Sequence, residues 1–168
     1  MNWINVLKKK LFWSDTYNDR LRLIANYKME LFDGEGKLKD VRVGHNLVTE
    51  LCLTMIADQL LASPSIAKPG WMEVGTGSGQ TINSTTLATY ISGSRTALDS
   101  KTKSGGEVTM VCTFPAGTGT GAITEAGVFN IVTGNTTDLL LYDDFAVINK
   151  LAADVLIITW KLTIDQSA

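Results

Sequence analysis

The sequence predicts a mainly β fold, a β-sandwich-like antiparallel domain with one buried helix and an N-terminal amphipathic helical arm. Three observations lead to this expectation. Apolar and polar residues alternate over much of the chain beyond residue 20, as in half-buried strands. One early stretch is apolar at nearly every position, which is typical of a buried helix. The connections between the later strands are too short for crossover helices, so antiparallel pairing is expected.

The composition favours one folded domain. The chain has 168 residues, of which 45% are apolar and 19% charged, with a net charge of −2. Such a chain can bury a substantial core, so disorder is excluded as its main state. It lacks the basic excess that broad nucleic-acid binding requires, and it has no apolar run of the roughly 20 residues that a membrane-spanning helix needs. Because Trp3 and Ile4 precede the lysines, the N-terminus does not match a secretory signal, and we expect assembly in the cytoplasm.

Residues 1–19 predict an amphipathic docking arm, ahead of a single β-rich domain over residues 20–168. Apolar side chains recur at helical spacing within residues 2–14, which predicts a short helix. Its apolar stripe could dock in a groove of a partner chain, fold back on the chain's own core or lie on a membrane. We expect docking on a partner chain, through Trp3, Ile4, Leu7, Leu11 and Trp13.

The β pattern begins directly after the arm. Apolar residues at every second position of Leu21–Leu31 share one face, which predicts a half-buried strand. Residues 33–36, Asp-Gly-Glu-Gly, predict a turn, and residues 37–43 can pair back as a hairpin. Leu38 is out of phase with the two valines that follow it, so we expect a bulge there.

A buried helix is expected over about residues 46–62, with Asn46 at its start. Pro64 cannot continue a helix and marks its end. The two cysteines of the chain are far apart in sequence. Cys52 lies in this helix and Cys112 in a later strand, both among apolar neighbours, so we expect two buried, inert thiols without a disulfide.

The rest of the body predicts a series of strands joined by short turns. Their expected ranges are residues 71–75, 108–114, 123–131, 139–147 and 155–164. The short turns between the last four predict an antiparallel meander. Residues 84–98 are polar with scattered apolar positions and give no periodic pattern.

Few residues could carry catalysis. The chain has one histidine, His45, so a Ser-His-Asp or Cys-His device would have to form around it. We expect a capping or packing role for His45, because catalysis also needs a positioned nucleophile and an orienting group. Asp143 and Asp144 could form the carboxylate pair of a hydrolase, but adjacent residues of a strand point to opposite faces. No His, Cys, Asp or Glu cluster has metal-ligand spacing, and we expect no enzyme activity, metal or cofactor.

Two glycine-rich segments resemble ligand-binding loops only superficially. Residues 75–79, Gly-Thr-Gly-Ser-Gly, lack both the ending of a phosphate-binding P-loop and the spacing of the dinucleotide fingerprint. We expect a strand-to-loop connection there. The Asp33 turn lacks the later ligands of a calcium loop, so a simple turn is expected.

From Leu31 onward, the order of segments resembles that of small structural proteins of tailed bacteriophages. The resemblance rests on Leu31–Lys37 with Gly44–Thr49, on Met72–Gly77 with Thr85–Leu87, on Gly121–Asn130, and on Phe145–Lys150 with Asp154–Ile164. The last two stretches are the most specific. The first 20 residues lie outside the resemblance.

The resemblance implies a non-enzymatic structural component of the virion, at the tail or the head-to-tail collar, that acts by protein–protein assembly. We expect a homo-oligomer, in a symmetric ring or a trimer. Its partners would be portal, collar, tail or capsid proteins, with no small-molecule substrate, nucleic acid or membrane. The alternative within the same class is a head decoration or head-fibre protein, which would be present in far more copies.

A different class of function is carbohydrate recognition in host attachment, which needs exposed aromatic side chains on a groove. Trp71 and Trp160 lie in strand patterns that predict burial, so Tyr90 and Tyr142 are the expected exposed candidates. A hydrolase of the cell wall or capsule is disfavoured, because the sequence offers no convincing pair of acid and base.

Overall fold

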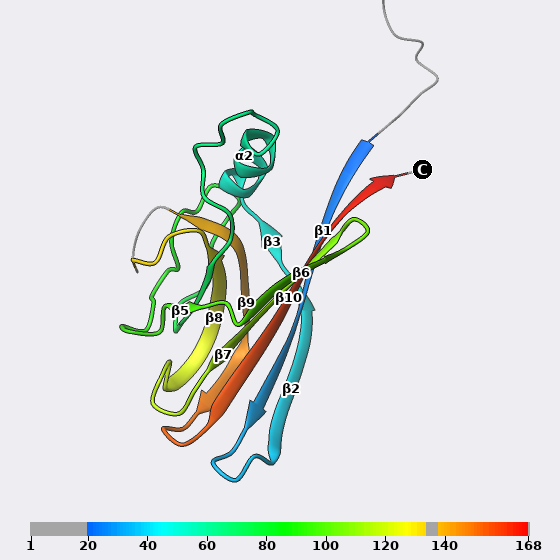
Figure 1. The fold of residues 1–168 in the computed structure, drawn as a ribbon. Coiled ribbons are helices and arrows are strands. Elements are labelled where there is room, and N and C mark those ends of the chain that lie inside the picture. The colour runs from blue at the N-terminus through cyan, green and yellow to red at the C-terminus, as the bar shows by residue number, and fades with distance from the viewer. Residues whose placement is uncertain (1–19, 134–137, 168) are drawn as a thin grey trace, which may run out of the picture.

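The computed structural model describes residues 20–133 and 138–167, so the predicted arm and its five docking residues lie outside the described part of the chain. Two five-stranded antiparallel sheets face each other (Figure 1), which confirms the expected mainly β fold. Sheet A has the strand order β2-β1-β10-β7-β6, and sheet B the order β3-β9-β8-β4-β5.

Strands that are close in sequence lie in different sheets. Sheet A consists of β2 (Leu38–His45), β1 (Arg20–Phe32), β10 (Val155–Ser167), β7 (Glu107–Phe114) and β6 (Ser100–Ser104). Sheet B consists of β3 (Leu47–Val48), β9 (Leu139–Lys150), β8 (Gly121–Phe129), β4 (Trp71–Gly75) and β5 (Thr96–Ala97).

The predicted meander is wrong. The chain passes from sheet A to sheet B between β7 and β8 and returns between β9 and β10, so that β10 lies between β1 and β7. A short connection can close a hairpin within one sheet or bridge two sheets about 10 Å apart, and turn length alone does not distinguish the two. Of the expected neighbours, β8 and β9 do pair as a hairpin.

The longest pairing joins the two ends of the described chain. Strand β1 pairs with β10 along its whole length, from Arg20 opposite Ser167 to Phe32 opposite Val155. The inner faces of both strands point into the core, where Trp160 is fully buried and packs against Tyr27 with ring centroids 5.8 Å apart. The alternation predicted these two strands and the burial of Trp160 correctly.

The first hairpin also forms as predicted. The Asp33 carboxylate accepts backbone hydrogen bonds from Glu35 and Lys37, at 3.0 and 2.9 Å, which closes the turn. The register then shifts, because Leu31 lies opposite Asp40 while Phe32 lies opposite Leu38. This irregularity is the bulge that the phase of Leu38 predicts.

The helix is shorter and more exposed than the sequence predicts. Helix α2 (Glu50–Asp58) begins after Thr49, whose hydroxyl accepts the backbone N–H of Cys52 at 3.3 Å. Asn46 is therefore not the N-cap, since the next residues form β3 and pair with β9. Only one face of the helix packs on the core: Cys52 is buried, whereas the side chain of Leu53 is 42% exposed. Because the segment is apolar at nearly every position, its sequence does not indicate that only one face packs on the core.

Both cysteines are buried and free, as expected. Burial raises the pKa of the Cys52 thiol and of the Cys112 thiol to about 12. Both therefore stay protonated near neutral pH and are poor nucleophiles.

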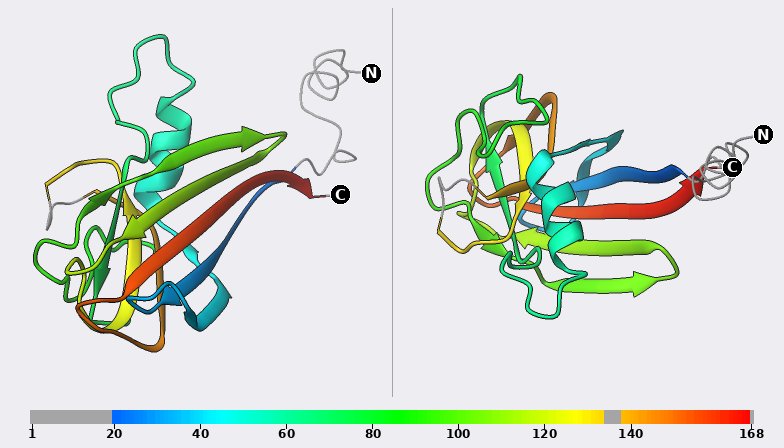
Figure 2. Two further views of the ribbon diagram at one scale, coloured as in Figure 1. Left: turned by 60° about the horizontal axis from the view of Figure 1, so that its bottom comes forward. Right: turned by 90° about the horizontal axis from the view of Figure 1, so that it is seen from above.

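The two layers do not remain parallel over their whole length. The sheets diverge toward the end where α2 and the start of β1 lie (Figure 1). Seen from above, the ends of β1, β10 and the β6–β7 hairpin extend beyond α2 (Figure 2). The inner face of sheet A is therefore covered by sheet B at one end and faces α2 at the other.

Candidate assembly surface

The outer face of sheet A carries apolar side chains near the hairpin tips. Three of them lie on the edge strand β2: Leu38, Val41 and Val43 are 47%, 42% and 74% exposed. Half-buried Phe32 of β1 and Val155 and Ile157 of β10 lie beside them on the same face, as the pairing registers show. The run Val-Leu-Ile-Ile at the start of β10 is apolar on both faces, so burying its inner residues leaves apolar side chains outside.

Strand β2 is an edge to which no described strand is paired on its outer side. The charged side chains of this edge are neutralised within the chain: the ammonium of Lys39 lies 2.6 Å from the Asp154 carboxylate, and the guanidinium of Arg42 lies 2.9 Å from Asp40. An unpaired, apolar edge of this kind is a template for another strand.

The opposite edge of sheet A differs. Strand β6 is exposed along all five residues and carries Lys101 and Lys103. Exposed lysines on an edge strand discourage pairing with another chain. The contrast between the two edges makes β2 the candidate interface of this sheet.

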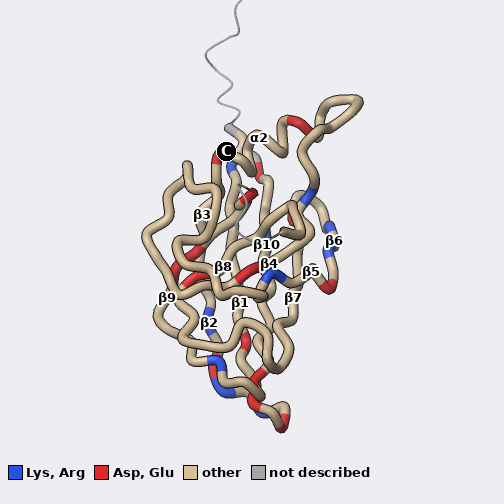
Figure 3. The backbone as a smooth tube through the Cα atoms, turned by 90° about the vertical axis from the view of Figure 1, so that its left-hand side faces the viewer, with Lys and Arg blue, Asp and Glu red and all other residues tan. Residues whose placement is uncertain are grey.

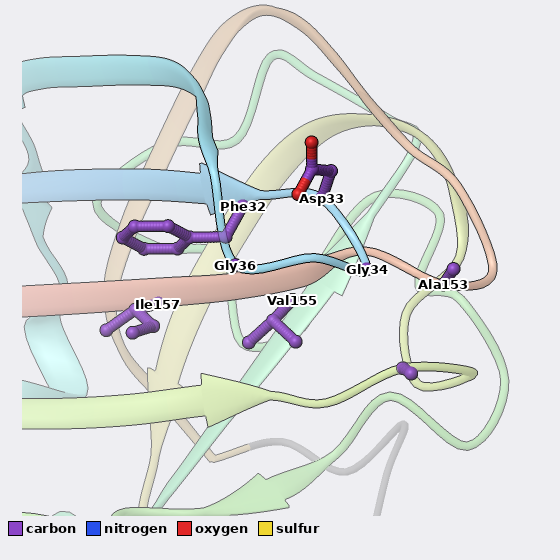
Figure 4. Close-up of a pocket in the computed structure, with 8 residues that line it drawn as sticks. Phe32, Asp33, Gly34, Gly36, Ala153, Val155 and Ile157 are labelled. Atoms are coloured by element: carbon purple, nitrogen blue, oxygen red, sulfur yellow. The ribbon is translucent and has the colours of Figure 1, made fainter.

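A hollow of about 470 Å³ lies at the hairpin tips beside this surface. Figure 4 shows Phe32, Val155 and Ile157 gathered on β1 and β10, with the Asp33 turn and Ala153 at the rim. Asp33 is the one charged residue of the lining, and its carboxylate is already engaged by backbone amides of the turn. The hollow therefore suits an apolar side chain better than a polar small molecule.

His45 lies at the end of β2, beside a second hollow of about 420 Å³. Its Nδ1 is 2.5 Å from Oδ1 of Asn26. Tyr27, which lines the same hollow, hydrogen-bonds the Asp143 carboxylate, and burial raises the pKa of that carboxyl above its usual value. These polar groups are engaged with one another, and no Ser, Thr or Cys nucleophile lines the hollow. Of the two roles expected for His45, capping or packing, capping is wrong because α2 begins five residues later.

The neighbouring carboxylates Asp143 and Asp144 do not act as a pair. Asp143 is half-buried against Tyr27, whereas Asp144 is exposed and accepts the backbone N–H of Gly79 at 2.8 Å. Their different partners agree with the expectation that adjacent residues of β9 point apart.

The glycine-rich loop after β4 is held by an internal carboxylate. Glu125 of β8 is fully buried and accepts backbone N–H groups from Gly77 at 2.9 Å, Ala88 at 3.0 Å and Thr89 at 2.7 Å. A Cβ atom on Gly75 would approach the Glu125 carboxylate to 2.5 Å, so the glycine allows this close packing. Backbone amides at both ends of this loop are thus engaged by a carboxylate of the chain itself.

A second buried polar network was not foreseen from the sequence. The guanidinium of Arg95 lies 3.0 Å from Glu73 and 3.0 Å from Asp138, and its central carbon is 3.5 Å from the ring centroid of Phe129. All three charged side chains are at most 5% exposed. Burial raises the pKa of Glu73, while the guanidinium opposes that shift. Arg95 lies in the segment without a periodic pattern, so only the buried carboxylate partners reveal its role.

The two tyrosines expected at the surface differ in exposure. Tyr90 is 39% exposed, but Tyr142 is only 3% exposed and packs in a small apolar cluster with Phe129 and Leu139. The prediction that Tyr142 is exposed is therefore wrong. Trp71 is half-buried against the same cluster. The described surface thus provides one of the two expected tyrosines for stacking on a sugar.

Further observations limit what the described residues could bind. No group of three or more His, Cys, Asp or Glu side chains in residues 20–133 and 138–167 is arranged to hold a metal ion. Within the same ranges, no helix is long and apolar enough to cross a membrane. Basic and acidic positions are interspersed over the face of the molecule that Figure 3 shows.

Comparison of the chain with protein-family models, curated proteins and solved structures found no match.

Proposed function

We propose that this protein is a non-enzymatic structural component of a tailed phage virion, at the tail or the head-to-tail collar, and that it acts by protein–protein assembly. The observation that carries the assembly role is the apolar, unpaired edge of sheet A at β2. The sequence resemblance described above supplies the virion context.

The most specific stretches of the resemblance have structural roles. Glu125, in Gly121–Asn130, fastens the loop after β4 through three backbone amides. Lys150 is 1% exposed, and its ammonium donates to the backbone oxygens of Pro115 at 3.0 Å and Asp154 at 2.6 Å. The Lys150 contacts fasten the two loops that connect the sheets, β7–β8 and β9–β10. A rigid β body of this kind suits a protein that presents a surface rather than performs a reaction.

The proposed partner of the β2 edge is a second copy of this chain. Strand addition along β2 would satisfy the free backbone groups of the edge, and Val41 and Val43 would be buried in the same step. Repeating one such interface around an axis would give a ring, the form of assembly expected for a collar or tail component. The hollow beside Phe32 could then receive an apolar side chain of the neighbour.

Position in the particle separates this proposal from its alternative. A head decoration or head-fibre protein could use the same edge, and the copy number decides between the two. A carbohydrate-binding role receives less support, because Tyr142 is buried.

The experiment is incorporation of variants into phage particles. Val43→Asp places a charge on the β2 edge, and Ser100→Asp places the same charge on the outer face of the opposite edge strand. We expect both variants to fold as the wild type does, because both positions are exposed. Val43→Asp should be lost from purified particles while Ser100→Asp is retained. Full incorporation of Val43→Asp would contradict the role of the edge, and absence of the wild-type chain from particles would contradict the function.

A further inference from the structure

A third hollow, which we call the α2 cleft, lies where the two layers diverge. It has a volume of about 560 Å³ and lies between α2 and the inner face of sheet A. Its apolar lining includes Met55, Ile56, Val108, Met110, Leu162 and Ile164. Lys68, Lys101 and Lys103 also line it.

The apolar inner face of sheet A continues past the covered part of the sandwich. In β1 this face runs back from Met29 and Ala25, which are buried, to Leu23, which is half-buried, and Leu21, which is 68% exposed. Across the sheet, Leu23 lies opposite Ile164 of the cleft lining. The sequence thus maintains a core-like pattern over a stretch that no described element covers.

A segment that could cover this open stretch of sheet A lies next to it in the sequence. The described chain starts at Arg20, opposite Ser167, at the same end of sheet A as the cleft. The preceding 19 residues include the amphipathic stretch 2–13 and a polar connection, residues 14–19. Six extended residues span up to about 20 Å, and a helix of twelve residues is about 18 Å long. The stretch can therefore reach the cleft of its own chain.

We propose that the α2 cleft holds the amphipathic segment 2–13 of the same chain, with the stripe of Trp3, Ile4, Leu7 and Leu11 against the apolar lining. A tether of six residues gives the segment a high effective concentration at its own cleft, which favours it over the cleft of another molecule. The sequence left three docking surfaces open for the arm: a partner chain, the chain's own core and a membrane. The cleft and the short tether favour the chain's own core. The inference goes beyond the assembly role and does not depend on it.

The charges of the segment and of the cleft predict how docking depends on salt. The segment carries Lys8, Lys9 and Lys10, and the cleft carries three lysines of its own, so docking must be driven by apolar contact against a like-charge repulsion. Salt screens that repulsion, and docking should strengthen as ionic strength rises. An acidic partner segment in the same cleft would show the opposite dependence.

The test is paramagnetic broadening in the full chain. A nitroxide is attached to Lys103→Cys at the cleft, or to Ala116→Cys in an exposed loop near the opposite end as a control. The native thiols, with pKa values raised to about 12 by burial, should react slowly with the label. We expect strong broadening of the Trp3 and Trp13 indole signals with the Lys103→Cys label, and little with the control.

Two additions separate the outcomes. In a mixture of spin-labelled chains and isotope-labelled chains without nitroxide, we expect no broadening, and broadening there would show a segment exchanged between copies and overturn the proposal. Leu7→Asp should abolish the effect, whereas Lys9→Asp, with the same new side chain outside the stripe, should preserve it. Absence of broadening in the full chain, or weaker broadening at higher salt, would also overturn the proposal.

Discussion

Glu125→Gln isolates the contact that holds the loop after β4. The carboxylate accepts three backbone N–H groups: Oε1 accepts those of Gly77 and Thr89, and Oε2 accepts that of Ala88. In the glutamine variant, the amide oxygen can keep the first two bonds. The amide nitrogen takes the place of Oε2, and its N–H groups face the N–H of Ala88.

The cost can be worked from these three bonds. Loss of an acceptor for a part-buried N–H costs about 1–3 kcal/mol, and the two remaining bonds weaken because their acceptor is no longer charged. The neutral side chain is cheaper to bury, which offsets part of that loss. We therefore expect a net destabilisation of about 2–3 kcal/mol. Glu35→Gln, at an exposed position of the first hairpin turn, is the matched control and should change stability by less than about 0.5 kcal/mol.

Urea denaturation of the two variants measures the difference in unfolding free energy. Amide hydrogen exchange adds a local readout, since the Ala88 amide should lose more protection than those of Gly77 and Thr89. If Glu125→Gln is as stable as Glu35→Gln, the carboxylate does not fasten the loop.

Three further predictions concern stability. Gly44→Ala should destabilise by about 1–3 kcal/mol in urea denaturation, because the new Cβ would overlap the Tyr27 side chain, and Tyr27→Phe should recover part of the loss. Arg95→Met should cost about 3–5 kcal/mol, since it leaves two buried carboxylates without their cation, and an unchanged melting temperature would argue against the network. Burial raises the folded-state pKa of Asp143, so the folded chain binds a proton more tightly than the unfolded chain, and stability should fall as pH rises from about 4 through the raised pKa. Asp143→Asn should reduce that fall in a pH series of melting curves, and an unaltered series would contradict it.

Elements with a clear period could be predicted from the sequence. The alternation in β1, β7 and β10 identified strands whose inner residues are buried, and the phase of Leu38 located a bulge. The partner sheet of each strand could not be predicted, because the same alternation serves in either layer. The predicted helix is longer than α2, because an apolar run does not show where packing against the core ends. Thr49 followed by Glu50 is a capping signal that could have located its start.

The polar networks were harder to foresee. Arg95 lies in a stretch without period, and its importance comes from Glu73 and Asp138, which are distant in sequence. The sequence predicts an exposed Tyr142, but β9 lies inside sheet B and its first four residues are all buried. The candidate assembly surface could not be predicted either, because exposed apolar residues on an edge strand show the same alternation as core residues. Only the strand pairing shows whether such residues lie on an exposed edge or in the core.

We propose that the chain is a structural part of a phage particle at the tail–collar axis. Its copy number in purified particles, measured by quantitative mass spectrometry against the portal and major capsid proteins, tests this most directly. We expect a number close to that of the portal or a small multiple of it. A number near that of the capsid protein would contradict the tail–collar position and support the head decoration alternative, and absence of the chain from the particle would contradict the virion role altogether.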